Sequence, residues 1–149
     1  MGESLNLNPE TEPHPMERAV VLLKPGYLEY TDRLVDYLRK KDLVILDQKV
    51  VRFDAEMATD FYPHAAVAIE RTFGPEEFES RMKIFIDYIT GDDAIALLLE
   101  GDDAIQKVNR VRDKVRSWFH LEKPADAIHA SGNCEEAERE AAVLNLGSE

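Results

Sequence analysis

The stretch AVVLLKPG, residues 19–26, joins a short apolar run to a turn. Its two valines are β-branched and suit the pleated surface of a buried strand. Pro25 and Gly26 end the run, since both residue types favour turns. The stretch therefore predicts a buried strand over 19–23, with Lys24 at the point where the strand enters the turn.

Strand-like and helix-like patterns alternate outward from this stretch. Apolar runs predict a bulged strand at 43–53, another strand at 94–99 and a short one at 127–128. Helical spacing and N-terminal signals predict helices that begin near Thr31, after Asp54, at Pro75, after Asp102 and Asp103, and after Asn133. The last start has the capping-box pattern, because Glu136 follows Asn133 by three residues. This order favours an α+β domain in which helices cover a sheet of the βαββαβ type.

Length and composition set the domain organisation and exclude several classes of protein. The 149 residues suit one domain, placed at 17–146 after a proline-rich N-terminal arm at 1–16 that we expect to be disordered. The longest apolar run, 94–99, has six residues against about 20 for a membrane-spanning helix, so no membrane insertion is expected. The single cysteine, Cys134, excludes a disulfide framework and a multi-cysteine zinc site. Residues 1–16 have no apolar core of the signal-peptide kind, so a cytoplasmic location is expected. A net charge of −12 argues against nucleic acid as the main partner.

Positive charge is concentrated in one segment of this acidic chain. Five basic residues stand against two acidic ones between residues 110 and 123, a local charge of +3. Arginine suits a phosphate clamp, because its planar guanidinium can donate two parallel hydrogen bonds. Arg110, Arg112 and Arg116 are the candidates. The competing interpretation is that these arginines lie in solvent and offset neighbouring acids, and charge alone leaves both open.

His129 is the candidate nucleophile. It leaves the short predicted strand and enters a turn of small residues, so its ring is accessible while its backbone is held. A neutral imidazole is a capable nucleophile when an acceptor fixes one ring nitrogen. Glu140 could be that acceptor, with Ser131 holding the carboxylate, although a histidine at a strand end is often structural or merely exposed. The four histidines show no metal-binding spacing, so no protein-bound metal is expected.

Several short segments, taken in order, resemble the nucleoside diphosphate kinase family. They are LLKP at 22–25, EG at 100–101, VRSWF at 115–119, DAIHAS at 126–131 and AERE at 137–140. The most specific feature is the histidine segment followed by AERE, with Glu140 eleven residues after His129. The order and approximate spacing match from about residue 17 to residue 144.

The resemblance implies a fold, a reaction and a set of roles. In that family a ferredoxin-like βαββαβ domain with an antiparallel sheet transfers the terminal phosphate of a nucleoside triphosphate to a histidine and then to a nucleoside diphosphate. Magnesium (Mg2+) is carried by the nucleotide phosphates, typically those of ATP. The implied site residues are the phosphorylated His129, the phosphate-binding Lys24 and Arg116, Tyr62 beside the histidine, Glu140 on its other nitrogen, and Ser131 against Glu140. The expected partners are nucleoside di- and triphosphates and a second copy of the chain, at least as a dimer.

Other positions depart from the family's pattern. Asn109 stands where the family has an arginine, with Arg110 or Arg112 as a substitute, and Asp126 replaces an asparagine that meets the nucleotide. Gly26 replaces an acidic residue, and the loop that carries a phosphate-binding threonine is largely missing.

The departures also affect the base site and leave alternatives open. The base-stacking phenylalanine falls near an apparent insertion at 65–79, where Phe78 and Phe73 are the candidates. One alternative is a catalytically weak or inactive kinase-like domain that binds nucleotide or a protein partner. The other is a histidine phosphocarrier that passes the group to a protein.

Overall fold

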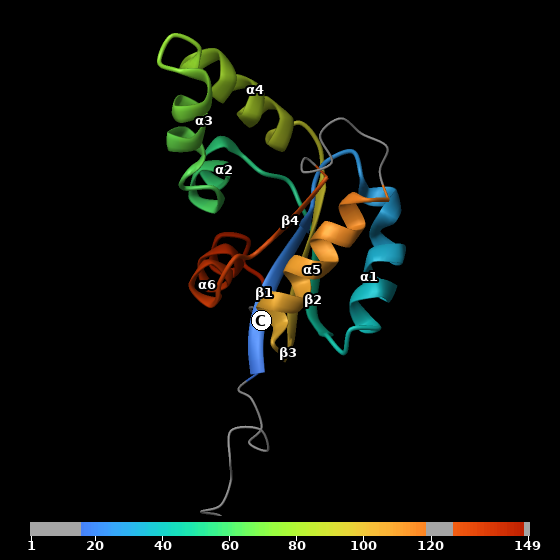
Figure 1. Cartoon of the computed structure of the whole chain (residues 1–149). Helices are drawn as coiled ribbons and strands as arrows, with labels where there is room; N and C mark the ends of the chain where they lie inside the picture. The colour runs from blue at the N-terminus through green and yellow to red at the C-terminus, as the bar shows by residue number, and fades with distance from the viewer. Residues whose placement is uncertain (1–15, 119–126, 148–149) are drawn as a thin grey trace, which may run out of the picture.

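A four-stranded antiparallel sheet lies at the centre of the computed structural model, which describes residues 16–118 and 127–147 (Figure 1). Its strands are β1 (Met16–Leu23), β2 (Val44–Val51), β3 (Ala94–Asp102) and β4 (Ile128–Ala130). They pair in the order β2-β3-β1-β4, and every pairing is antiparallel. The strand predicted at 19–23 thus lies between β3 and β4. The predicted ferredoxin-like α+β fold is confirmed.

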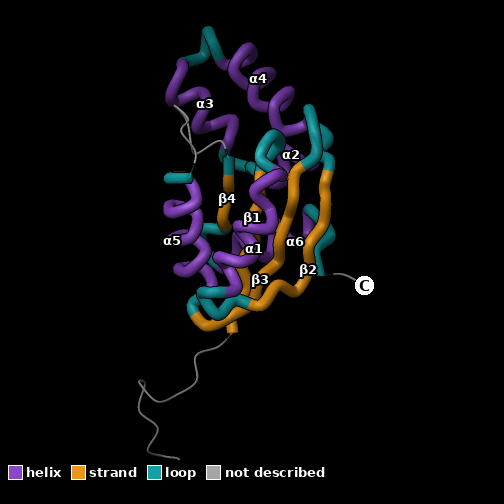
Figure 2. Tube along the Cα trace, turned by 90° about the vertical axis from the view of Figure 1, so that its right-hand side faces the viewer, coloured by secondary structure: helices purple, strands orange, loops and turns teal. Residues whose placement is uncertain are grey.

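Helices cover both faces of the sheet. One face carries the short 3-10 helix η2 (Leu28–Tyr30), α1 (Thr31–Arg39) and α5 (Ala104–Arg116), which pack against residues 19, 21 and 23 of β1. The other face carries α2 (Ala55–Phe61), α4 (Phe78–Thr90) and α6 (Cys134–Val143), which pack against residues 20 and 22. Because side chains alternate along a strand, β1 contributes to two separate cores. Helix α3 (Ala65–Phe73) buries no residue and forms a hairpin with α4 beyond one end of the sheet (Figures 1 and 2).

Some element boundaries differ from the predictions. Met16, which was assigned to the arm, is the first residue of β1. The helix expected to begin at Pro75 begins at Phe78, and the apparent insertion at 65–79 contains α3. The bulge in β2 is confirmed as a register shift between Ile45 and Asp47. None of the described helices is long and apolar enough to cross a membrane.

Two of the predicted helix caps are confirmed and one is wrong. Asp54 Oδ1 accepts from Met57 N, and Asn133 Oδ1 accepts from Glu136 N, each at 2.8 Å. Asp103 precedes α5 but its side chain makes no capping bond, because its backbone is left-handed (φ 54°) rather than extended as in a usual cap. Glu17 of β1 supplies the acceptor instead, with Oε1 at 3.1 Å from Ile105 N.

Candidate active site

His129 lies in the middle of β4, opposite Leu22 of β1. Its neighbours Ile128 and Ala130 point into the core beneath α5, so the alternation of the strand turns the imidazole toward α2 and α6. The ring packs edge-on against Phe61 and Tyr62, at centroid distances of 5.1 and 5.4 Å. Its side chain remains 20% exposed. The histidine is therefore packed against two aromatic rings and still accessible.

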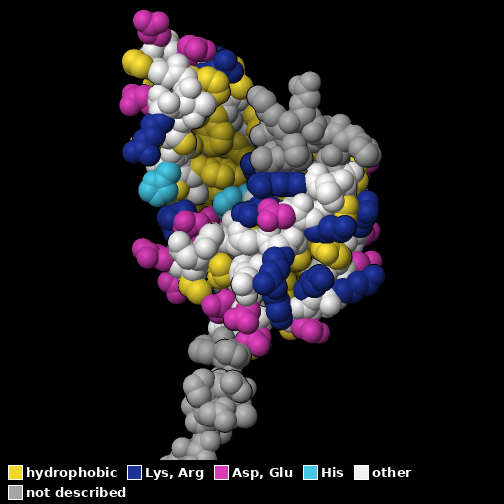
Figure 3. Space-filling model, in the orientation of Figure 1, with side chains coloured by type: hydrophobic (Ala, Val, Ile, Leu, Met, Phe, Trp, Pro, Cys, Tyr) yellow, Lys and Arg dark blue, Asp and Glu magenta, His cyan; other side chains and the backbone are white. Residues whose placement is uncertain are grey.

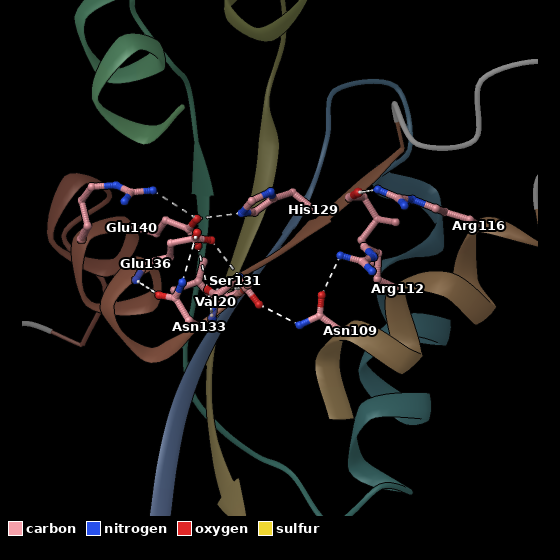
Figure 4. Close-up of polar contacts among 12 residues, drawn as sticks. Val20, Asn109, Arg112, Arg116, His129, Ser131, Asn133, Glu136 and Glu140 are labelled. Carbon is pink, nitrogen blue, oxygen red and sulfur yellow. Dashed lines mark hydrogen bonds and ion pairs between the residues drawn. The ribbon is translucent and has the colours of Figure 1, made fainter. Parts of the chain in front are cut away.

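A buried carboxylate orients this ring. Glu140 of α6 is 1% exposed, and its Oε2 lies 2.9 Å from His129 Nε2 (Figure 4). Ser131 Oγ donates to Glu140 Oε1 at 2.7 Å and accepts from Val20 N at 2.9 Å. Because a carboxylate only accepts hydrogen bonds, the proton of the neutral ring is assigned to Nε2, and Nδ1 keeps its lone pair.

The turn between β4 and α6 fixes the distance between His129 and Glu140. Asn133 caps α6, and Glu136 Oε1 accepts from Gly132 N at 2.9 Å. Glu136 thus reaches one residue further back than in a standard capping box, where it would bind the N–H of the cap residue itself. Both bonds start the helix at a defined point, so Glu140 is buried on its inner face.

Cationic side chains approach the histidine from α5 and from the end of β1. Arg116 Nη2 donates to Ile128 O at 3.3 Å, on the outer edge of β4. Arg112 Nη1 donates to Asn109 Oδ1 at 2.6 Å, and Asn109 in turn reaches the turn after His129 (Figure 4). The Nζ atom of Lys24 lies 5.7 Å from the centre of the Tyr62 ring. Three of the predicted phosphate-binding cations therefore lie around β4.

A cavity of about 240 Å³ opens in front of His129 and Glu140. One wall is mainly apolar and comes from α2, α3 and the turn between them: Phe61, Tyr62, Pro63, Ala65 and Ala68. Figure 3 shows hydrophobic side chains gathered in a hollow between the α3–α4 hairpin and the rest of the molecule. Arg139 also lines the cavity, with Nη2 3.8 Å from Glu140 Oε2. The cavity thus combines an apolar wall with a polar floor, as small-molecule sites commonly do.

Tyr62 presents a hydroxyl group that is unusually reluctant to ionise. Burial raises the pKa of Tyr62 far above its usual value of 10, and the nearby charges of Glu140 and Tyr88 raise it further. Among the residues that the structure describes, none makes a hydrogen bond to this buried hydroxyl. A buried donor without a partner is costly, which makes this hydroxyl a candidate donor to a ligand beside His129.

The structure does not bring all the predicted residues to this site. Arg110 is exposed, because it lies two residues before Arg112 and so about 160° away around α5. Phe78 begins α4 and does not line the cavity, and the ring of Phe73 packs against Arg81. Asp126 lies outside the described residues.

Among the residues at the site, Phe61 and Arg139 were not predicted to belong to it. Phe61 packs on His129 and Arg139 lines the cavity. Their proximity to Tyr62 and Glu140 in sequence was the available signal.

The fold and the site together define a class of protein, an α+β phosphotransferase built around a carboxylate-bound histidine. The comparisons with known proteins agree. Residues 17–146 match the family model for nucleoside diphosphate kinase. The chain is 31% identical over 137 residues to the nucleoside diphosphate kinase of Listeria monocytogenes, covering 84% of this chain and 86% of that one.

Two further relatives extend this likeness. The Methanocaldococcus jannaschii nucleoside diphosphate kinase is 29% identical over 136 residues, covering 83% of this chain and 89% of the relative. A crystal structure of the Aquifex aeolicus nucleoside diphosphate kinase matches with a TM-score of 0.65 at 26% identity, covering 87% of this chain and 95% of that one. The chain therefore belongs to the nucleoside diphosphate kinase family, and it is an enzyme that transfers phosphate between nucleotides.

Proposed function

We propose that His129 carries the phosphoryl group between nucleotides and that Nδ1 is the atom that is phosphorylated. The Nδ1 lone pair attacks the terminal phosphorus of a nucleoside triphosphate. The N–P bond forms while the bond from phosphorus to the bridging oxygen breaks, and the electron pair leaves with the nucleoside diphosphate. A second nucleoside diphosphate then takes the group from Nδ1, which gives a ping-pong reaction.

The contact between His129 Nε2 and Glu140 Oε2, at 2.9 Å, carries this proposal. It commits Nε2 to the carboxylate and leaves Nδ1 as the nucleophile. As the N–P bond forms, the ring gains positive charge, and the buried carboxylate stabilises that charge. Ser131 keeps Glu140 in place through its bond to Oε1.

The cations and Tyr62 are the proposed phosphate ligands. Lys24, Arg112 and Arg116 would offset the charge of the transferred group, and the Tyr62 hydroxyl would donate to one of its oxygens. The described residues contain no cluster of three His, Cys, Asp or Glu side chains able to hold a metal ion. Following the family resemblance, we propose that Mg2+ arrives on the nucleotide as part of the substrate.

The test follows the phosphoryl group itself. The purified chain is incubated with Mg2+ and ATP labelled at the terminal phosphate, and an acid-labile adduct is sought before GDP is added. We expect labelled protein, then labelled GTP, and no adduct in His129→Gln, whose melting transition should show that it is still folded. A wild-type chain with no adduct would instead support the inactive kinase-like domain, and an adduct that GDP cannot discharge would support the phosphocarrier.

We also propose a homodimer in the cytoplasm. Strand β2 is an edge of the sheet, and its Val44, Leu46 and Val50 are 57%, 40% and 61% exposed. An apolar edge strand tends to pair with another chain. Light scattering should give twice the chain mass for wild type and a smaller mass for Val50→Lys; a monomeric wild type would refute the dimer.

The proposed cytoplasmic location is supported by the exposed thiol of Cys134, the single cysteine, because a reducing compartment keeps such a thiol free.

A further inference from the structure

Asn109 connects α5 to the turn that follows His129. Its Nδ2 donates to Ser131 O at 2.8 Å and to Ile105 O at 2.7 Å, while its Oδ1 accepts from Arg112 Nη1 at 2.6 Å (Figure 4). The bond to Ser131 spans 22 residues of sequence. One side chain therefore joins the histidine turn to a candidate phosphate-binding arginine.

The chemistry of these partners requires an amide. The carbonyl oxygens of Ile105 and Ser131 both need a donor, which the two hydrogens of the Asn109 amide nitrogen supply. The Arg112 guanidinium needs an acceptor, which the amide oxygen supplies, so the orientation of the amide is fixed. An aspartate would place a carboxylate against both carbonyls, and an apolar residue would make none of the bonds.

The position of β4 explains why this link is possible. Among the described strands, β4 is an edge strand of the sheet and pairs with β1 alone. Arg116 takes the edge carbonyl of Ile128, and Asn109 takes the carbonyl of Ser131, so α5 holds the segment at two points that flank His129. Asn109, Arg112 and Arg116 share one face of α5, at spacings of three and four residues.

Arg112 is left with donor capacity. Its Nη1 binds Asn109, and its Nε donates to Asp113 Oδ1 at 3.0 Å. Within residues 16–118 and 127–147, no recorded hydrogen bond or ion pair uses its Nη2. Holding two of the three guanidinium nitrogens limits the rotation of the side chain, which reduces the entropy lost when Nη2 binds an oxygen.

We propose that Asn109 is a positioning residue that ties the Arg112 guanidinium to the turn after His129, so that Arg112 binds a phosphate oxygen of the nucleotide. The inference rests on the proposed function, since it assigns Arg112 to the phosphates that His129 exchanges. It also explains how the chain can do without an arginine at position 109, because the cation comes from the next turn of α5.

A double-mutant cycle tests the coupling of the two residues. Asn109→Leu, Arg112→Met and the double variant are compared by kcat/KM for GDP and by the Kd of Mg-ADP, measured by calorimetry. Each single change should lower kcat/KM and weaken binding about tenfold, and the double variant should lose no more than Arg112→Met alone. Gln106→Leu, which removes an exposed amide from the same helix, should match wild type. Melting temperatures show whether any variant has lost its fold.

The outcomes separate the inference from the proposed function. If the two losses multiply to about a hundredfold in the double variant, Asn109 acts only on the fold and the inference is wrong while transfer stands. If the wild-type protein binds Mg-ADP but His129 is never labelled, the proposed transfer through His129 is wrong. The Kd values of the single and double variants then still show whether Asn109 acts through Arg112. If wild type does not bind Mg-ADP, both proposals fail.

Discussion

Glu140 illustrates how one buried side chain can serve both folding and chemistry. Each of its carboxylate oxygens has a donor, His129 on one and Ser131 on the other, so its burial is compensated. Glu140→Gln keeps the shape but presents an amide donor to one of these partners. We expect the rate of His129 labelling to fall about 100-fold or more, since the ring loses its orientation and its charge partner.

Rapid-quench measurement of labelling checks this prediction, with Glu135→Gln as the matched control. Glu135 is exposed on the same helix, so its change should leave the rate at the wild-type value. Labelling of Glu140→Gln at the wild-type rate would mean that the ring does not depend on this carboxylate.

Tyr62→Phe separates a ligand-binding hydroxyl from a structural one. No described residue bonds to the hydroxyl, so its loss should leave stability at neutral pH within about 1 kcal/mol of wild type while transfer falls about tenfold. The pKa of Tyr62 is raised by folding, so this group stabilises the fold fully below its unfolded pKa of about 10 and loses that contribution as the pH rises above it.

Urea denaturation at neutral pH and above pH 10 measures this effect. Wild type should lose more stability than Tyr62→Phe as the solution becomes alkaline, because the other tyrosines are common to both proteins. Equal losses in the two proteins would show that the Tyr62 hydroxyl is solvated rather than buried.

The site residues that sequence could predict are local to one another. His129, Ser131 and Glu140 belong to one strand, one turn and one helix, so spacing and residue type suffice to place them together. Asn109 could not be assigned in this way, because its role depends on α5 packing against the outer edge of β4. Arg112 and Arg110 were equivalent by composition, and only the rotation of α5 distinguishes them.

At the scale of elements, the strands were predicted better than the helices between them. The apolar runs of β1 and β3 are buried on both faces and leave little ambiguity. Helix α3 has no buried residue, and its segment was taken as an insertion relative to the family's pattern rather than as a helix. Asp103 does not cap α5 because its backbone is left-handed, and the long-range partner that bonds to the helix start instead, Glu17, does not show in the local sequence.

The start of α6 offers a test at this scale. Asn133→Ala removes the acceptor for Glu136 N and should cost about 1 kcal/mol of unfolding free energy. Transfer should also slow severalfold, because α6 carries Glu140 to His129. Asn133→Ser keeps a capping oxygen, so it should retain most of the wild-type unfolding free energy, measured by urea denaturation, and most of the wild-type transfer rate, measured by labelling. Full activity in Asn133→Ala would show that Ser131 and the ring alone hold Glu140 in place.

Across the whole molecule, the charge of the chain and the charge of its site oppose each other. Thirty acidic residues against eighteen basic ones give −12, yet Lys24, Arg112 and Arg116 gather around β4. These cations attract a bound phosphate at short range. The more distant acidic residues repel it only weakly, because dissolved salt screens charges that lie further than about 8–10 Å apart.

The same net charge predicts how the fold responds to salt. Repulsion among surface acids destabilises the folded state, and salt screens this repulsion. Raising NaCl from about 0.02 to about 0.5 M at neutral pH should therefore increase the free energy of unfolding by on the order of 1 kcal/mol. For a domain of this size that corresponds to a rise of about 3 °C in Tm. Near the isoelectric point, about 4.8, the charge of −12 is lost and the salt effect should largely disappear. An equal rise in Tm at both pH values would assign the effect to salt exclusion from apolar surface, since that term does not depend on net charge.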